Sequence, residues 1–190
     1  MVSLILASSG LDPTVVIGGR FNNLGTGAKL GKGEYLVAEA DESDGSFLRL
    51  SPTFAIVTNI DNDHLDHYGT LDNIKEAFVQ FINKVPFYGC AVLCNENQYL
   101  KDIFSRITRK YYTYGLDSSA DFKAVNIETI ELSSKFDVLY NDKFLGKIEL
   151  NLPGRHNILN ALAAITCSYE LGIEFSKIAK ALLELSLIHI

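Results

Sequence analysis

Two acidic stretches of the sequence each follow a short apolar run directly. Residues 39–44 carry four carboxylates in six residues, and residues 58–68 carry three carboxylates together with His64 and His67. Open α/β sheets bind ligands beyond the carboxyl ends of their strands, so polar residues placed after apolar runs are the first candidates for chemistry. We expect both stretches at one edge of the sheet, where they repel each other unless a divalent cation or a basic partner neutralises them.

Each stretch also has a purely structural interpretation. An acidic run can be a solvated loop, and the stretch around His64 can be a helix start capped by Asp63 or Asp66. The occurrence of both at successive strand ends favours a metal site, and oxygen ligands with one imidazole suit Mg²⁺ or Mn²⁺. Mg²⁺ held by so few protein ligands normally shares its shell with phosphates. A metallohydrolase site on His64, Asp66 and His67 is a further hypothesis that lacks a third ligand cluster.

A glycine-rich stretch, residues 18–33, precedes the first acidic cluster. It has neither the Gly-x4-Gly-Lys-Ser/Thr spacing of a phosphate-binding loop nor the dinucleotide-binding pattern after a strand. It is therefore either a surface loop or a loop that contacts substrate.

A third polar group follows Pro153 and Gly154 at the start of an apolar helical pattern. His156 or Asn157 could simply cap this helix, whereas Asn160 lies one turn inside it, where asparagine has poor helix propensity. The spacing of His156 and Asn160 puts both side chains on one face, and an amide there can recognise a heteroaromatic edge by donating and accepting together.

The pattern of apolar residues predicts an α/β fold with a mostly parallel sheet flanked by helices. Residues 121–151 change character and predict a small antiparallel meander with a polar turn at residues 141–143. We expect a single domain, with strands at residues 14–17, 35–38, 54–58 and 91–94 and helices at residues 1–9, 71–84, 97–108 and 157–171.

Composition excludes several classes of protein. The 190 residues are 47% hydrophobic, which excludes disorder, and the net charge of −6 argues against nucleic-acid binding. The longest apolar runs are about five or six residues, too short to cross a membrane. The cysteines, Cys90, Cys94 and Cys167, lack paired spacing and predict reduced, buried thiols in a cytosolic protein.

Taken together, these motifs resemble the central, P-loop-type ATP-binding domain of the Mur ligases. The residues that carry the resemblance are Glu39–Asp44 with Ser46–Leu48, Ala55–Ile60, Asp63–Asp66 with Tyr68, Leu152–Asn157, and Asn160–Ala164. The sequence Glu-Ser-Asp-Gly-Ser-Phe at residues 42–47 points to the branch that adds L-alanine to UDP-N-acetylmuramate in bacterial peptidoglycan synthesis. The alternatives are a related muropeptide-recycling ligase and a non-catalytic Mg²⁺-binding α/β domain.

The resemblance implies a reaction and roles for individual residues. In this family, ATP phosphorylates the substrate carboxylate, and the amino group of the incoming amino acid attacks the acyl phosphate, in the cytoplasm. By resemblance, Glu39 and His64 are catalytic Mg²⁺ (or Mn²⁺) ligands. By the same resemblance, other positions hold the adenine of ATP, namely His156, Asn157 and Asn160, or line the substrate side, namely Asn59, Asn22 and Ser43.

The resemblance also shows what the chain lacks. The family's phosphate-binding loop would precede residue 1, and the N-terminal UDP-binding and C-terminal amino-acid-binding domains are absent from the sequence. We therefore expect residues 1–184 to be the central domain, without ligase activity by itself. Residues 185–190 resemble a sequencing-adapter translation, and we expect them to be a non-native tail.

Overall fold

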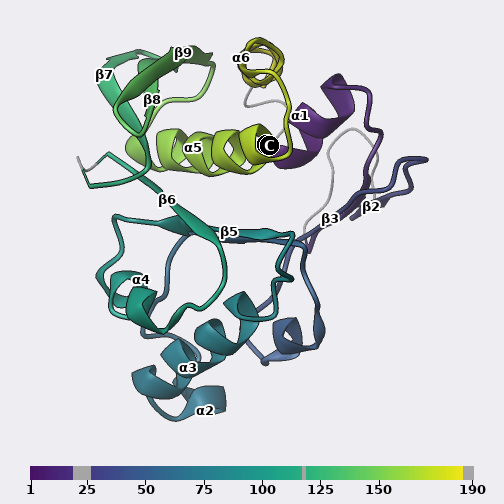
Figure 1. Cartoon of the computed structure of the whole chain (residues 1–190), viewed down its shortest axis with the longest axis vertical. Coiled ribbons are helices and arrows are strands. Elements are labelled where there is room, and N and C mark those ends of the chain that lie inside the picture. Colours follow the sequence, from purple (N-terminus) through teal and green to yellow (C-terminus); the bar gives the residue numbers. More distant parts are fainter. Residues whose placement is uncertain (19–26, 117–118, 186–190) are drawn as a thin grey trace.

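Short apolar runs and amphipathic stretches build a layered α/β structure, shown in a computed structural model that describes residues 1–18, 27–116 and 119–185 (Figure 1). The strands are β1 (Thr14–Val16), β2 (Ala28–Lys29), β3 (Leu36–Ala38), β4 (Phe54–Val57), β5 (Cys90–Cys94), β6 (Tyr111–Gly115), β7 (Phe122–Ile130), β8 (Ser133–Tyr140) and β9 (Lys143–Leu150). The helices are α1 (Val2–Ser8), α2 (Leu65–Tyr68), α3 (Leu71–Ile82), α4 (Gln98–Lys101), α5 (Arg155–Glu170) and α6 (Phe175–Leu183), with 3-10 turns η1 (Ser46–Arg49) and η2 (Phe104–Arg106).

The strands form two sheets within the described residues. One has the order β2-β1-β3, with β1 and β3 parallel, and the other has the order β4-β5-β6-β7-β8-β9. Strands β4 to β7 run parallel, and β7, β8 and β9 form the expected antiparallel meander. The predicted α/β fold is therefore confirmed, but β3 and β4 belong to different sheets instead of one.

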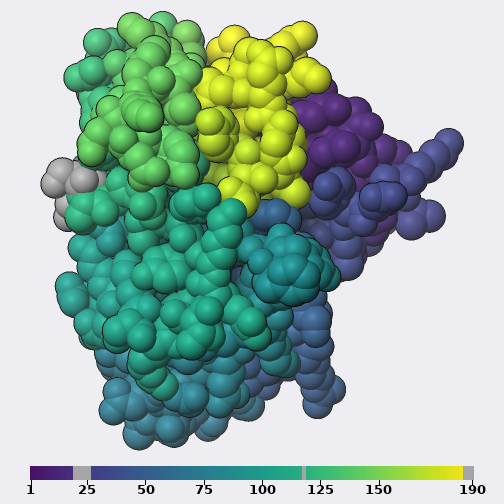
Figure 2. Space-filling model, viewed as in Figure 1, coloured from purple at the N-terminus to yellow at the C-terminus, as the bar shows by residue number. Residues whose placement is uncertain are grey.

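Helices cover both faces of the larger sheet. Figure 1 shows α5 on one face and α3 with α4 on the other. Between these helices, every residue of β5 is buried, as its continuous apolar sequence predicts. In Figure 2, α1 and α6 lie side by side at the surface although they come from opposite ends of the sequence.

The predicted helix over residues 97–108 is wrong in extent. Only α4 and the turn η2 form there. Tertiary hydrogen bonds replace the helical ones, because the Asn83 side chain donates to the Arg106 carbonyl and accepts from the Thr108 amide. The end of α3 thus interrupts a segment whose apolar spacing alone favours a helix.

The meander turn and helix α5 follow local sequence signals. Asn141 and Asp142 have φ angles of 48° and 65°, the left-handed pair typical of a two-residue hairpin turn. Helix α5 begins two residues before the predicted start, after Gly154, and Gly172 follows its end with φ of 79°. Neither His156 nor Asn157 caps α5, since both lie within it.

Candidate functional site

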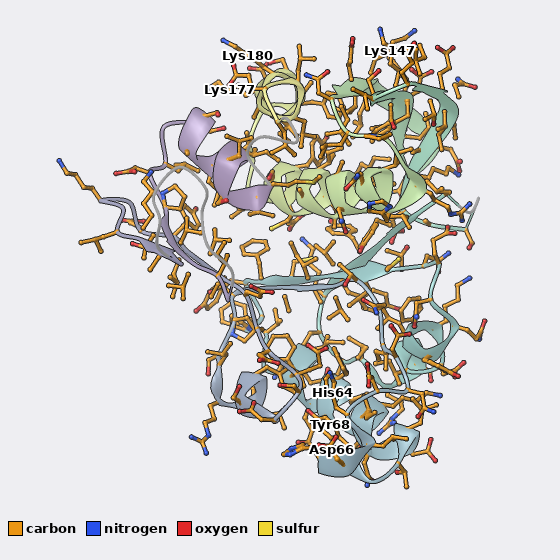
Figure 3. All side chains as sticks on the ribbon, turned by 180° about the vertical axis from the view of Figure 1, so that it is seen from behind. His64, Asp66, Tyr68, Lys147, Lys177 and Lys180 are labelled. Atoms are coloured by element: carbon orange, nitrogen blue, oxygen red, sulfur yellow. The ribbon has the colours of Figure 1, made fainter. Side chains whose placement is uncertain are left out.

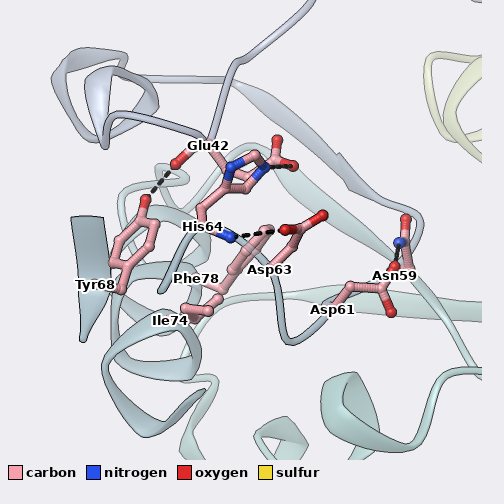
Figure 4. A pocket seen from close by; sticks show the side chains of 8 residues that line it. All are labelled: Glu42, Asn59, Asp61, Asp63, His64, Tyr68, Ile74 and Phe78. Carbon is pink, nitrogen blue, oxygen red and sulfur yellow. Dashed lines mark hydrogen bonds and ion pairs between the residues drawn. The ribbon is translucent and has the colours of Figure 1, made fainter. Parts of the chain in front are cut away.

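A pocket forms where the loops after β3 and β4 meet (Figure 4). Acidic and amide side chains surround its mouth, and buried apolar side chains of α3 form its floor. Its lining consists of Glu42, Asn59, Asp61, Asp63, His64, Tyr68, Ile74 and Phe78. The expectation that the two acidic stretches lie together is therefore met, although their strands belong to separate sheets.

Direct contacts join the two loops. His64 Nε2 lies 3.8 Å from Glu42 Oε1, and the Tyr68 hydroxyl donates to the Glu42 carbonyl oxygen at 2.5 Å. Figure 3 places His64, Asp66 and Tyr68 together on this side of the molecule. The structure thus pairs His64 with Glu42, which the sequence analysis did not single out, and leaves Glu39 outside the lining.

His64 has an unusual backbone conformation. It occupies the N-cap position of α2 with φ of 54°, and its amide donates to the Asp63 carboxylate at 3.0 Å. A left-handed histidine costs about 1–2 kcal/mol, and such strain is concentrated at functional sites. The alternative of a helix start capped by Asp63 or Asp66 is not what forms, because the N-cap residue is His64 and its side chain makes no capping hydrogen bond.

Glu39 is placed by the strand pairing. Its backbone amide donates to the Val16 carbonyl, and its carboxylate Oε2 accepts from the Gly18 amide at 2.7 Å. Residue 39 is exposed and directly follows the carboxyl end of β3. Asn22 lies outside the described residues. Ser43 neighbours the pocket, and its amide donates to the Asp41 carboxylate at 2.9 Å.

The described residues do not form a complete protein site for a metal ion. Among the described residues, no group of three or more His, Cys, Asp or Glu side chains is arranged to hold a metal ion. Mg²⁺ in nucleotide sites takes one or two protein ligands and completes its shell with phosphates and waters, so such a site needs no larger protein cluster. The metallohydrolase hypothesis needs a complete protein ligand set, which the described residues do not supply.

Hydrogen bonds favour the ionised forms of Asp41 and Asp44. The Ser43 side chain and amide lower the pKa of Asp41, and the Ser46 side chain and amide lower the pKa of Asp44. The concentrated negative charge of this loop therefore persists at neutral pH and attracts cations.

The third polar group lies apart from this pocket, at the first turns of α5. His156 and Asn160 are both exposed, as their spacing on one helix face predicts. The His156 ring folds back over Gly154, whose φ is 101° and whose added Cβ would lie 3.0 Å from that ring. The Asn157 amide group donates to the Pro153 carbonyl at 2.7 Å, so it braces the start of the helix.

Contacts after β5 fix the positions of both regions, and the sequence analysis missed them. The Asn97 side chain accepts from the Ile60 amide and donates to the Ile60 carbonyl, which pins the loop after β4. Glu96 pairs with Arg155 at the start of α5 and accepts from the Leu116 amide at 2.7 Å. The only sequence signal for these residues is their place directly after an apolar strand.

Comparison with known proteins gives consistent matches. Residues 21–168 match the model of the Mur ligase middle domain. The UDP-N-acetylmuramate–L-alanine ligase of Endomicrobium trichonymphae is 55% identical over 179 residues, covering 94% of this chain and 40% of that protein. The chain thus spans about 40% of the length of such curated relatives.

Two solved structures share the fold closely. The UDP-N-acetylmuramate–alanine ligase of Thermotoga maritima is 28% identical, with a TM-score of 0.84 over 96% of this chain and 40% of its own. A ligase from Neisseria meningitides that joins UDP-N-acetylmuramate to L-alanyl-γ-D-glutamyl-meso-diaminopimelate also scores 0.84, at 27% identity, covering 97% of this chain and 61% of its own. Within residues 1–18, 27–116 and 119–185, no helix is long and apolar enough to cross a membrane.

Proposed function

The chain belongs to the Mur ligase family, and from that premise we propose that it is the ATP-binding core of a ligase that joins L-alanine to UDP-N-acetylmuramate in the bacterial cytoplasm. The observation that carries the proposal is the 55% identity to a ligase named for this reaction. The pocket between the two acidic loops supports it, since amide-bond formation driven by ATP needs a place for phosphate and its counter-ion.

We assign Glu39 and His64 as the catalytic metal ligands of this site. Mg²⁺, or Mn²⁺, supplies charge neutralisation for the phosphates of ATP when it is bound. The Gly18 amide restrains the Glu39 carboxylate, and the Asp63 carboxylate restrains the backbone of His64 through its amide. When ligand side chains are already restrained, less free energy is lost in ordering them as the nucleotide binds.

We assign the exposed face at the start of α5 to the adenine of ATP. Asn160 can donate to and accept from a purine edge at once, and His156 on the same face offers a ring for stacking. Asn157 is engaged with the Pro153 carbonyl, so its part in the adenine site is to brace the first turn. The Glu96–Arg155 ion pair fixes this turn to the loop after β5.

We assign the substrate side to the loops that flank the pocket. Asn59 lies in the lining and donates to the Asp61 carboxylate at 2.6 Å, and Ser43 lies beside Glu42 in the other loop. Asn22 completes this proposed set. The muramoyl carboxylate of UDP-N-acetylmuramate needs polar groups of this kind near the metal ligands.

We further propose that the 190-residue chain turns over no substrate by itself. Its sequence contains no Gly-x4-Gly-Lys-Ser/Thr spacing, and the lysine and hydroxyl of that motif cradle the β- and γ-phosphates. Weak Mg²⁺-dependent ATP binding through α5 should remain.

We also propose that residues 1–184 are a central domain and that residues 185–190 are a non-native tail. Leu185, which is buried, is the last described residue.

The decisive experiment uses the complete reading frame that contains this chain. Purified protein should release ADP from ATP only when UDP-N-acetylmuramate and L-alanine are both present, and the 190-residue chain should release none. ADP release with L-alanyl-γ-D-glutamyl-meso-diaminopimelate in place of L-alanine would instead assign the recycling reaction. Mg²⁺ binding without any ATP binding would favour a non-catalytic metal-binding domain.

A further inference from the structure

We propose that Tyr68 is a positioning residue that holds the acidic loop after β3 against the His64 loop after β4, and thereby sets the spacing of the metal-binding side chains. The inference rests on the proposed function, because it assigns Tyr68 a task at the same phosphate site. Tyr68 ends α2 and lines the pocket with His64 and Glu42 (Figure 4).

The first support is the contact that Tyr68 makes across the pocket. Its hydroxyl donates to the backbone carbonyl of Glu42 at 2.5 Å, a bond between residues 26 positions apart. Its own carbonyl accepts from the Asn73 side chain at 2.7 Å, which ties the residue to the first turn of α3. Tyr68 therefore connects the acidic loop to a helix anchored in the core.

The second support is the close approach of the two segments beside that bond. The His67 ring packs edge-on against Tyr68 with centroids 4.7 Å apart. A Cβ added to Gly45 would lie 3.0 Å from His67 Nε2, and Gly45 has φ of 72°, which favours glycine. The acidic loop thus lies directly against α2 at two neighbouring points.

The third support is that the other anchors of the acidic loop lie at its two ends. At its start, the Glu39 amide donates to the Val16 carbonyl. At its end, the buried Phe47 ring packs against Phe78 and Phe81 at centroid distances of 5.3 and 5.0 Å. Between these anchors, the Tyr68 hydrogen bond to the Glu42 carbonyl and the approach of the Glu42 carboxylate to His64 join the middle of the loop to the His64 loop.

The hydroxyl remains a donor at working pH. Burial, and then the negative charges of Glu42, Asp44 and Asp41, raise the pKa of Tyr68. The phenol is therefore protonated at neutral pH and can donate this hydrogen bond.

Tyr68→Phe tests the proposal because it removes the hydroxyl and keeps the ring. The matched control is Tyr88→Phe, at a residue 69% exposed in the connection between α3 and β5. In the metal-free 190-residue chain, amide hydrogen exchange at residues 43–46 should become about fivefold faster in Tyr68→Phe, the effect of losing one hydrogen bond. Tyr88→Phe should leave this exchange unchanged.

A second measurement links the loop to the phosphate site. In the complete reading frame, the Mg²⁺ concentration for half-maximal alanine-dependent ADP release should rise about fivefold or more in Tyr68→Phe, well below the melting temperature. A purely structural role would lower the melting temperature without changing the Mg²⁺ requirement.

The outcomes separate this inference from the proposed function. Unchanged exchange in Tyr68→Phe overturns the positioning role, and faster exchange with an unchanged Mg²⁺ requirement overturns its link to metal binding. A wild-type protein without alanine-dependent ATP turnover overturns the proposed function instead, while the exchange experiment still decides whether Tyr68 holds the loop.

Discussion

At the scale of single residues, the sequence reveals chemical types but not their partners. Glu39, His64 and Asn160 stand out as candidates in the sequence because each follows a predicted strand or lies at the start of a predicted helix. The roles of Tyr68 and Asn97 were not, because each bonds a backbone group 26 or 37 positions away. Such pairings depend on how the chain folds over long range, which local spacing does not encode.

Removing the Asn160 amide should weaken nucleotide binding. We expect Asn160→Ala to reduce the affinity of the 190-residue chain for Mg²⁺-ATP about tenfold, the loss of one to two hydrogen bonds. Isothermal titration calorimetry measures it, with Gln80→Ala on the exposed face of α3 as the control. Equal affinity in wild type and Asn160→Ala would remove this helix turn from the adenine site.

The buried thiols should resist modification in the folded protein. Burial raises the pKa of Cys90 to about 11 and that of Cys167 to about 12. Because the thiolate is the reactive form, little of it exists at pH 8, and the labelling rate of Cys90 should keep rising until about pH 11. Ellman's reagent should label the cysteines rapidly only in urea. Fast labelling of the native chain at pH 8 contradicts this burial.

At the scale of elements, strong local signals were predictable and weak ones were not. The meander was evident from two short strands around a polar turn, and α5 from its apolar pattern. Strand β6 was not predicted, because its three tyrosines and a threonine do not form an obvious apolar run. Tyr114 is nevertheless only 1% exposed. Its burial also raises the pKa of its hydroxyl. Strand β2 has two residues, too few for any periodicity.

The meander turn offers a test of backbone conformation. Asn141→Ala should destabilise the protein by about 1 kcal/mol, because alanine tolerates the left-handed region poorly. Asn141→Gly should be neutral or slightly stabilising at the same position. Urea denaturation of both variants gives the comparison. A similar loss in both would mean that the asparagine side chain, rather than its φ of 48°, matters here.

At the scale of the whole molecule, the charge pattern follows from two loops meeting at one pocket. The chain has a net charge of −6, and three of its carboxylates, those of Glu42, Asp61 and Asp63, line this pocket with His64, so they repel one another there. The layered α/β fold was predictable from alternating apolar runs. The division into two sheets was not, because strand order depends on long-range pairing.

Divalent cations should therefore stabilise the folded chain. At a Mg²⁺ concentration of ten times its dissociation constant, we expect the free energy of unfolding to rise by about 1.4 kcal/mol. Thermal melting with Mg²⁺, with EDTA, and with NaCl at equal ionic strength distinguishes binding from screening. His64→Ala should lose the Mg²⁺-specific gain. Equal stabilisation by NaCl would assign the effect to screening alone.

The division into two sheets also has a practical consequence for handling the protein. Within the described part of the chain, β3 is an edge strand of the smaller sheet and β4 is an edge strand of the larger one. Each pairs in parallel with its one neighbouring strand. Such edges carry backbone groups ready to pair, and Leu36 on β3 is 63% exposed. The purified chain should therefore self-associate as its concentration rises, so dilute samples are needed for every solution measurement.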